Sequence, residues 1–319
     1  MYWVLWALCG MIAVSITRIL TKNLLYTYST SLVTMVQFLI GAICSILATN
    51  TTLSFSSVQI WTVLSGIATG FTTYFLNKSY NYVTNPGLPF MVYRLETILT
   101  TILSYLIFTK SVALNTKKLV AMTVMIASLG VLVISTPKSQ EEKGAENFQS
   151  TDISSNVAKS ILKPWVGYAI LSALSCAIMI LTTKKVLLHS GDTDNHTTFQ
   201  LIFAALTIII VYIYSQSNDD SNIDLDTINT DDLLKLLGVG FGYFGFIYSL
   251  NRSVKISPNP GYSKSIVAGS TLIVPFVSQY LFRNSFLNIQ QWVAMFFSIG
   301  AMGYIAQPTK EELKMEHCH

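Results

Sequence analysis

Leu76-Asn77-Lys78-Ser79, followed by Asn85-Pro86-Gly87, recurs in the second half of the chain as Leu250-Asn251-Arg252-Ser253 followed by Asn259-Pro260-Gly261. The two elements are equally far apart in both copies. The chain therefore contains an internal repeat, and a repeat of this kind sets the architecture before any single residue is considered.

Weaker matches extend the repeat in both directions. Downstream, at almost the same offset, they join Asn115 to Asn288 and Val120-Ala121-Met122 to Val293-Ala294-Met295. Upstream, at a slightly shorter offset, they join Ala7-Leu8 to Ala173-Leu174 and Thr17-Arg18 to Thr183-Lys184. The chain thus divides into two halves of similar length.

The composition indicates an integral membrane protein. Of 319 residues, 51% are hydrophobic and 11% are charged, and the mean hydropathy is +0.51. Soluble domains are about 25% charged. The net charge of +4 is small and no basic stripe is present, so nucleic acid is not an expected partner.

Ten apolar segments approach the roughly 20 residues that a helix needs to cross a bilayer. They are predicted near residues 2–22, 30–49, 58–79, 86–108, 118–136, 165–187, 196–215, 233–253, 261–283 and 289–306. The expected organisation is a first five-helix repeat (1–136), a polar linker (137–164), a second five-helix repeat (165–306) and a polar tail (307–319). The aspartate-rich connection 216–232 is interpreted as a solvated loop.

An odd number of spans in each half predicts that the second half enters the membrane from the opposite side. The expected fold is therefore all-α, with ten transmembrane helices arranged as two inverted five-helix repeats. Secondary transporters share this plan, with the substrate site between the repeats near the middle of the bilayer. Ten spans place both termini on one side, which the distribution of Lys and Arg does not identify.

Glu96 is the acidic residue that falls inside a predicted span. It lies about ten residues into that span, roughly 15 Å along a helix, and an ionisable group at this depth is a functional hypothesis. It is a candidate for substrate binding and for carrying a coupling proton, or it pairs with another helix. Because Arg94 is two residues away, we expect the two side chains to point to different faces and not to neutralise each other.

Lys264, at the start of the ninth segment, corresponds in the repeat to Phe90. A charge that breaks the internal symmetry is what an asymmetric substrate would require. The alternative is that Lys264 extends to the membrane interface.

Four further basic residues occupy equivalent positions in the two halves. They form two repeat pairs near the ends of predicted spans: Arg18 with Lys184, and Lys78 with Arg252. One hypothesis is that they form matching anion-attracting vestibules on the two sides, and the alternative is ordinary interfacial anchoring.

The Asn-Pro-Gly elements are predicted to form tight turns before the fourth and ninth segments. Proline fixes φ and lacks a donor, and glycine permits unusual φ values. Pro86, Gly87, Pro260 and Gly261 are therefore candidate turn or gate residues. Pro275 is expected to kink the ninth segment and to free the carbonyl of Thr271.

Several polar and aromatic residues are candidates to line a substrate site. They are Tyr93, Asn77, Tyr248 and Ser263, together with Tyr74 and Tyr243, whose rings are suited to stacking on a base or a sugar.

Enzymatic and metal chemistry have little support in the sequence. The spans lack paired carboxylates, and all four histidines are expected in loops or in the tail. His317-Cys318-His319 is a weak candidate metal site at a terminus. We expect no enzyme activity, no metal and no cofactor.

The segments Leu76–Ser135 and Leu250–Ala306 resemble the ends of two EamA-type repeats. With ten spans in five-plus-five inverted halves, the chain resembles the drug/metabolite transporter superfamily. The resemblance implies cytosolic termini, peripheral fifth and tenth spans, and the capacity to form a homodimer. Lys264 lies near the start of the ninth segment, where anion-handling members are similar in carrying basic residues. The Phe-Tyr-Asn-Asn and Gly-Ala-Leu-Asn-Lys motifs of GDP-mannose transporters are absent.

Arg94, Lys264 and Arg18 outweigh Glu96 in charge, which favours an anionic or zwitterionic substrate. The predicted function is secondary transport of such a metabolite by alternating access, and nucleotide-sugar or phosphorylated-metabolite antiport is favoured. The alternatives are a proton-coupled exporter of amino acids or other metabolites and a non-transporting membrane scaffold. The expected partners are a small-molecule substrate and the lipid bilayer.

Overall fold

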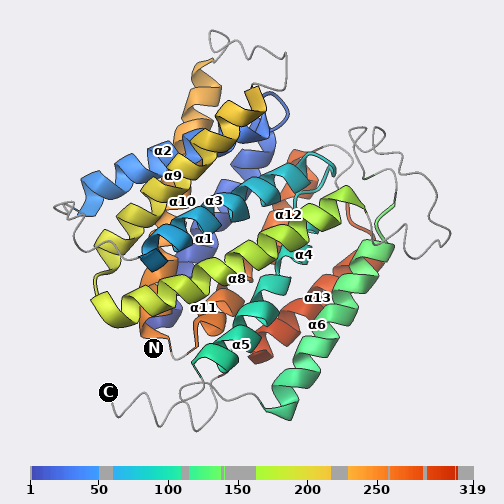
Figure 1. The fold of residues 1–319 in the computed structure, drawn as a ribbon. Coiled ribbons are helices and arrows are strands. Elements are labelled where there is room, and N and C mark those ends of the chain that lie inside the picture. Colours follow the sequence, from blue (N-terminus) through green and yellow to red (C-terminus); the bar gives the residue numbers. More distant parts are fainter. Residues whose placement is uncertain are drawn as a thin grey trace.

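The computed structural model describes residues 2–49, 60–108, 115–137, 140, 163–216, 229–257, 259–282, 286–305 and 307. Within these residues the elements are α-helices joined by turns (Figure 1). They are α1 (Tyr2–Leu24), α2 (Thr30–Thr49), α3 (Ile60–Tyr80), α4 (Gly87–Tyr93), α5 (Leu95–Ile107), α6 (Thr116–Ile134), α8 (Pro164–Ser190), α9 (Thr193–Gln216), α10 (Thr230–Ile256), α11 (Pro260–Val267), α12 (Ser270–Leu281) and α13 (Ile289–Ile305).

Helix positions follow the apolar segments of the sequence. Every predicted segment end lies within three residues of a helix end, with α4–α5 and α11–α12 each occupying one segment. Most of the linker, most of the acidic loop and nearly all of the tail lie outside the described residues.

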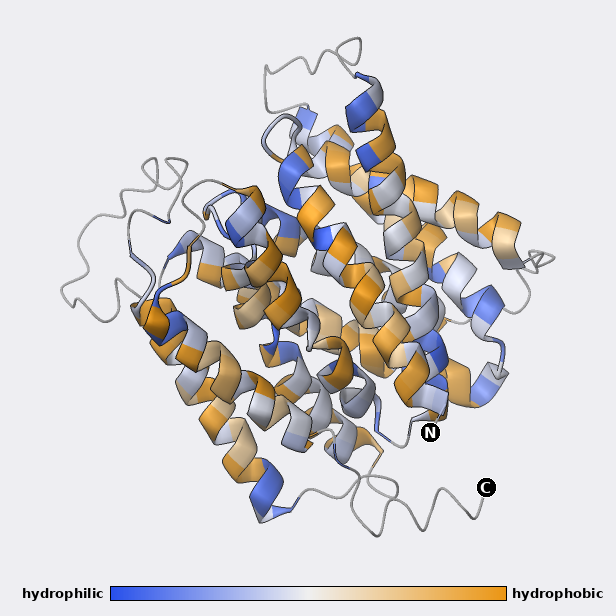
Figure 2. Cartoon of the chain, turned by 180° about the vertical axis from the view of Figure 1, so that it is seen from behind, coloured by the Kyte–Doolittle hydropathy of each residue, from blue (hydrophilic) through white to orange (hydrophobic). Residues whose placement is uncertain are grey.

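Among the described residues, seven helical stretches are long and apolar enough to cross a membrane: α1, α2, α4–α5, α6, α8, α9 and α10. The outer surface carries large exposed apolar side chains such as Ile12, Ile43, Ile126 and Ile210, and Figure 2 shows apolar residues along the outward helices. The chain is therefore a multi-pass membrane protein.

Two of the predicted spans are broken, and they break at equivalent positions. α4 ends at Tyr93 and α5 begins at Leu95, whereas α11 ends at Val267 and α12 begins at Ser270. At the first break, Thr97 donates its backbone N–H to the Arg94 carbonyl, and at the second Thr271 donates to the Ala268 carbonyl. These bonds reach back three residues instead of four, so each break is a tightened turn.

Pro275 does not mark the break, contrary to the sequence-based expectation. α12 runs through Pro275, and the interruption lies earlier, at Ala268–Gly269. Pro275 instead packs against the start of α4, where a Cβ added to Gly87 would lie 2.3 Å from the Pro275 Cβ. The proline therefore fills a helix contact that requires glycine on the other side.

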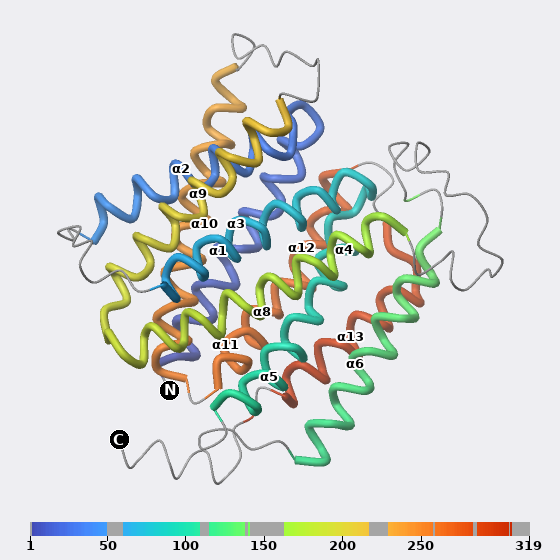
Figure 3. The backbone as a smooth tube through the Cα atoms, in the orientation of Figure 1, coloured from blue at the N-terminus to red at the C-terminus, as the bar shows by residue number. Residues whose placement is uncertain are grey.

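Helix packing is reciprocal between the two halves. α1 packs on α10 and α3 packs on α8, while α3 contacts α9 and α10 contacts α2. The broken helices follow the same pattern, since α5 contacts α11 and α4 contacts α12. α2 lies against α9 and α6 against α13, the latter pair at one edge of the bundle (Figure 3).

Candidate functional site

A buried ion-pair triad lies where the broken helices meet. Arg94 Nη1 lies 3.0 Å from Glu96 Oε1, and Lys264 Nζ lies 3.1 Å from Glu96 Oε2. All three side chains are at most 1% exposed. The carboxylate is thus held between two cations, with one positive charge in excess.

The direct Arg94–Glu96 contact corrects the prediction that these side chains diverge. That prediction assumed a continuous α-helix, in which residues two apart face different sides. The helix instead breaks at Arg94, where φ is helical at −65° but ψ is −8°, far from the α-helical value of about −42°. The local change in direction brings the guanidinium back onto the carboxylate.

Arg94 also joins the two helix breaks to each other. Its Nε donates to Thr271 Oγ1 at 3.0 Å, and its Nη2 donates to Ser270 Oγ at 2.6 Å. Ser270 is the repeat counterpart of Glu96, so the guanidinium lies between equivalent positions of the two halves. One side chain therefore fixes the relative position of both breaks.

Lys264 is fully buried, which excludes extension to the interface in this conformation. Besides Glu96, its Nζ donates to the Tyr93 hydroxyl at 3.3 Å, and that hydroxyl donates to Cys176 Sγ at 3.0 Å. Tyr93 thus belongs to the triad's immediate surroundings, and Cys176 adds a thiol from α8.

Arg18 lies in the interior instead of at a helix end. It is 1% exposed and six residues before the end of α1. Its Nη1 donates to Asn77 Oδ1 at 3.4 Å, and its guanidinium carbon lies 6.0 Å from the centre of the Phe90 ring. Arg94 packs on the same ring at 4.1 Å, so Phe90 links the two arginines.

The other three predicted vestibule residues lie outside this cluster. Lys184 Nζ donates to the carbonyls of Val254 and Ser257 at 3.0 and 2.8 Å, which caps the end of α10. Arg252 pairs with Asp194 at 2.6 Å, and Lys78 lies 5.1 Å from the centre of the Tyr168 ring. Equivalent positions therefore have different environments, which does not support matching vestibules.

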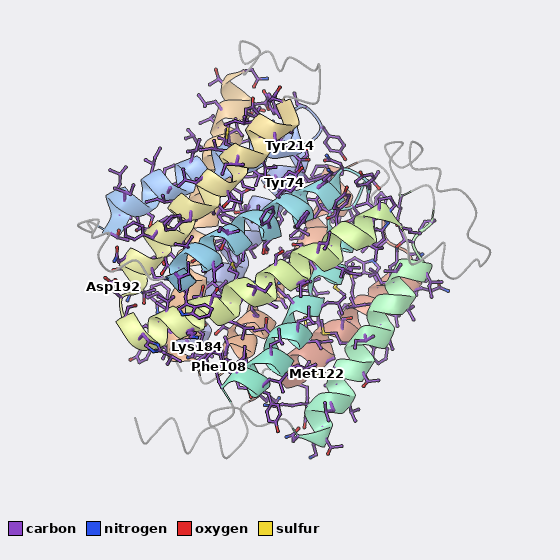
Figure 4. All side chains as sticks on the ribbon, viewed as in Figure 1. Tyr74, Phe108, Met122, Lys184, Asp192 and Tyr214 are labelled. Carbon is purple, nitrogen blue, oxygen red and sulfur yellow. The ribbon has the colours of Figure 1, made fainter. Side chains whose placement is uncertain are left out.

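The remaining predicted lining residues are also dispersed. Tyr243 is buried, with its hydroxyl 2.8 Å from Thr73 Oγ1, and Ser263 lies 2.7 Å from Ser253. Tyr248 receives a hydrogen bond from Arg252. Tyr74 is partly buried on α3, remote in Figure 4 from Lys184 on α8.

Both Asn-Pro-Gly elements form the same turn at the start of a helix. Asn85 Oδ1 accepts the backbone N–H of Gly87 at 2.8 Å, and Asn259 Oδ1 accepts that of Gly261 at 2.8 Å. Pro86 and Pro260 lie between these residues, in the position where a missing N–H costs nothing. The turns thus start α4 and α11 in the same way.

His196 corrects the expectation that every histidine lies in a loop or in the tail. It is buried in α9, where its ring nitrogens lie 3.4 Å from Thr62 Oγ1 and 3.3 Å from Thr183 Oγ1. His196 is the first residue of the predicted segment 196–215, and α9 begins still earlier, at Thr193, so the histidine lies within the helix. His189 lies in the last turn of α8, whereas His317 and His319 lie outside the described residues.

Sequence reasoning missed Phe90, Cys176, Ser270 and Thr271 as members of the central cluster. It also missed a match between α2 and α9, which joins Thr34 to Thr197 and Gln37 to Gln200. In the structure Asn77 donates to Thr34 and Asn251 donates to Thr197, at 3.0 and 2.9 Å. This match, at an offset slightly different from those of the other helices, was the available signal for polar partners on α2.

No known family model matches the chain, and no curated protein matches it. One solved structure, entitled only "Crystal structure of protein", has a TM-score of 0.59 at 16% sequence identity. The alignment covers 96% of this chain and 96% of that chain. The similarity therefore extends over the whole helical arrangement and concerns the fold alone.

Proposed function

We propose that this chain is a secondary transporter for a small anionic metabolite, of the drug/metabolite transporter type. The observation that carries the proposal is the excess of buried positive charge where two broken helices meet. Among the described residues, Glu96 is the one fully buried carboxylate, whereas three cations, Arg18, Arg94 and Lys264, are buried close to the helix breaks. Burying unneutralised cations is costly, so such residues in a membrane interior mark a substrate or ion site.

Ten spans in two inverted halves are part of this proposal. Reciprocal packing supports it. When a helix of the first half packs on a non-equivalent helix of the second half, the equivalents of these two helices also pack on each other, as α1 with α10 and α8 with α3 do. The equivalent breaks at Arg94 and at Ala268–Gly269 support it as well. Broken helices at a repeat interface are the usual location of transporter substrate sites. In this arrangement α3, α11–α12 and α13 also cross the bilayer, and the termini are cytosolic.

Glu96 positions the two cations in this mechanism. Its protonation would leave Arg94 and Lys264 facing each other without a counter-charge. In the closed state the substrate anion lies among the buried cations Arg18, Arg94 and Lys264, the two arginines sharing the Phe90 ring. Rearrangement of the helix breaks opens the site to one side and then to the other. The ion pairs favour this role for Glu96 over that of a coupling-proton carrier.

Counterflow exchange in proteoliposomes tests the proposal, with nucleotide sugars, sugar phosphates and amino acids as the panel. We expect saturable exchange of a phosphorylated compound. Lys264→Gln should lower the rate of this exchange by about tenfold or more, because it removes one charged donor. Lys235→Gln, at an exposed ion pair, is the control and should exchange normally.

Two results would contradict the proposal. Folded protein that exchanges no panel member would favour the scaffold alternative. Amino-acid uptake that is driven by a pH gradient and lost in Glu96→Gln would favour the proton-coupled exporter.

A further inference from the structure

Five buried polar atoms without hydrogen-bond partners lie on the three helices that the Arg18–Asn77–Thr34 hydrogen bonds join. They come from three helices and are Arg18 Nε and Thr21 Oγ1 of α1, both amide atoms of Gln37 on α2, and the Tyr80 hydroxyl of α3. Each of these side chains is at most 1% exposed. Buried polar groups are almost always hydrogen-bonded, so a cluster of exceptions calls for an explanation.

Hydrogen bonds connect the helices that carry these atoms. Arg18 donates to Asn77 Oδ1, and Asn77 Nδ2 donates to Thr34 Oγ1 at 3.0 Å. Gln37 is one turn from Thr34, Tyr80 is one turn from Asn77 and Thr21 is one turn from Arg18. Residues three apart share a helix face. The unpartnered groups therefore surround one region next to the Arg18 guanidinium.

The equivalent region of the second half is satisfied by the protein itself. Gln200, the counterpart of Gln37, donates to Thr69 Oγ1 at 2.9 Å and accepts from Asn251 Nδ2 at 2.8 Å. Lys184, the counterpart of Arg18, donates to three backbone carbonyls. The fold can thus satisfy polar groups at these positions, and it does so in one half alone.

Arg18 also differs from the cations of the triad. Arg94 and Lys264 share Glu96, but no carboxylate of a described residue lies within ion-pair distance of Arg18. The Nε atom forms part of the planar edge with which arginine binds carboxylates and phosphates in a bidentate manner. Arg18 thus presents both a charge and a directional donor edge.

We propose that Arg18 binds the oxyanion of the transported substrate and that Gln37 and Tyr80 bind the polar body that carries it. An amide offers both donors and an acceptor, and a phenol offers one of each. The ligand class is therefore a phosphate or carboxylate attached to a hydroxyl-bearing body such as a sugar. This inference rests on the proposed function and identifies where its substrate binds.

Thermal unfolding of the purified protein in detergent tests the site with glucose 6-phosphate, UDP-glucose and gluconate, and with uncharged glucose as the control. Wild type should be stabilised by at least one of the charged compounds and not by glucose. Arg18→Gln should raise the concentration for half-maximal stabilisation about tenfold or more, because a hydrogen-bonded charge is lost. If only the two phosphate compounds stabilise the protein, the bound oxyanion is a phosphate. If only gluconate does, it is a carboxylate.

Gln37→Leu gives a readout that a purely structural role would not produce. We expect it to raise the unfolding temperature without ligand, because an unsatisfied buried amide is replaced by an apolar group of similar size. The same change should weaken ligand stabilisation. The matched variant Gln200→Leu should lower the unfolding temperature without ligand, since Thr69 and Asn251 each lose a hydrogen bond. Its stabilisation by ligand should be unchanged.

The outcomes separate this inference from the proposed function. If no charged compound stabilises folded wild type or exchanges in the counterflow assay, both are wrong. If a charged compound stabilises wild type, and stabilises both Arg18→Gln and Gln37→Leu at the same concentrations as wild type, the proposed function stands and the substrate binds elsewhere. A lower unfolding temperature for Gln37→Leu together with unchanged ligand response would also overturn the site.

Discussion

Glu96→Gln should lower the free energy of unfolding by about 3–5 kcal/mol, as expected when one partner of a buried ion pair is removed. The variant leaves Arg94 and Lys264 buried side by side without a counter-charge. The glutamine amide accepts a hydrogen bond but supplies no negative charge. Thermal unfolding of the purified variant in detergent, compared with wild type, measures the effect.

A second substitution should rescue this loss. Glu96→Gln combined with Lys264→Gln restores the local charge to that of the wild-type triad, so the double variant should be more stable than Glu96→Gln alone. Lys235→Gln removes two ion pairs near the start of α10, one with exposed Asp231 and one with partly buried Asp232, and should leave stability nearly unchanged, because pairs near the surface contribute little. Additive effects of the two central substitutions would show that the triad is not coupled.

Gly87→Ala should destabilise the protein by about 1–3 kcal/mol or more, the range for overpacking a close contact. The added Cβ would lie 2.3 Å from Pro275 Cβ and 2.9 Å from Pro275 Cα. A proline ring has few ways to move aside, so α4 and α12 must separate. The unfolding temperature and the yield of monodisperse protein measure the effect.

Two other glycines provide the comparison for Gly87. A Cβ on Gly261 would meet Thr101 Oγ1 at 2.4 Å, and a threonine side chain can rotate, so Gly261→Ala should cost less than Gly87→Ala. A Cβ on Gly167, in α8, meets nothing within 4 Å. Gly167→Ala should therefore stabilise the helix by about 0.5–1 kcal/mol. Equal effects at Gly87 and Gly167 would contradict the packing described for α4 and α12.

The helices could be predicted because apolar segments and their boundaries are local properties of the sequence. Glu96 and Arg94 could be identified as candidates because charges are rare in such segments. Their contact could not be predicted, because it depends on a break at Arg94 that no proline or glycine marks. The break forms where Arg94 meets Ser270 and Thr271, which lie in the other half of the chain.

Arg18 and Gln37 show a second limit of sequence reasoning. The repeat correctly pairs Arg18 with Lys184, but equivalent sequence positions do not guarantee equivalent surroundings. Lys184 reaches the carbonyls at the end of α10, whereas Arg18 faces Asn77 and the Phe90 ring. Whether a buried amide has partners is decided by the helices packed against it, and a single helix sequence does not contain that information.

Chemical labelling of Cys176 tests alternating access at the central cluster most directly. Cys176 is fully buried, and its Sγ accepts a hydrogen bond from Tyr93, which contacts Lys264. A variant that retains only this cysteine, with Cys9, Cys44 and Cys318 replaced, would be reconstituted and treated with a membrane-impermeant thiol reagent from either face. A variant without Cys176 gives the background. Alternating access predicts labelling from both faces, slowed by the transported anion and unaffected by glucose. Labelling from neither face, or from one face with no effect of any substrate, would contradict it.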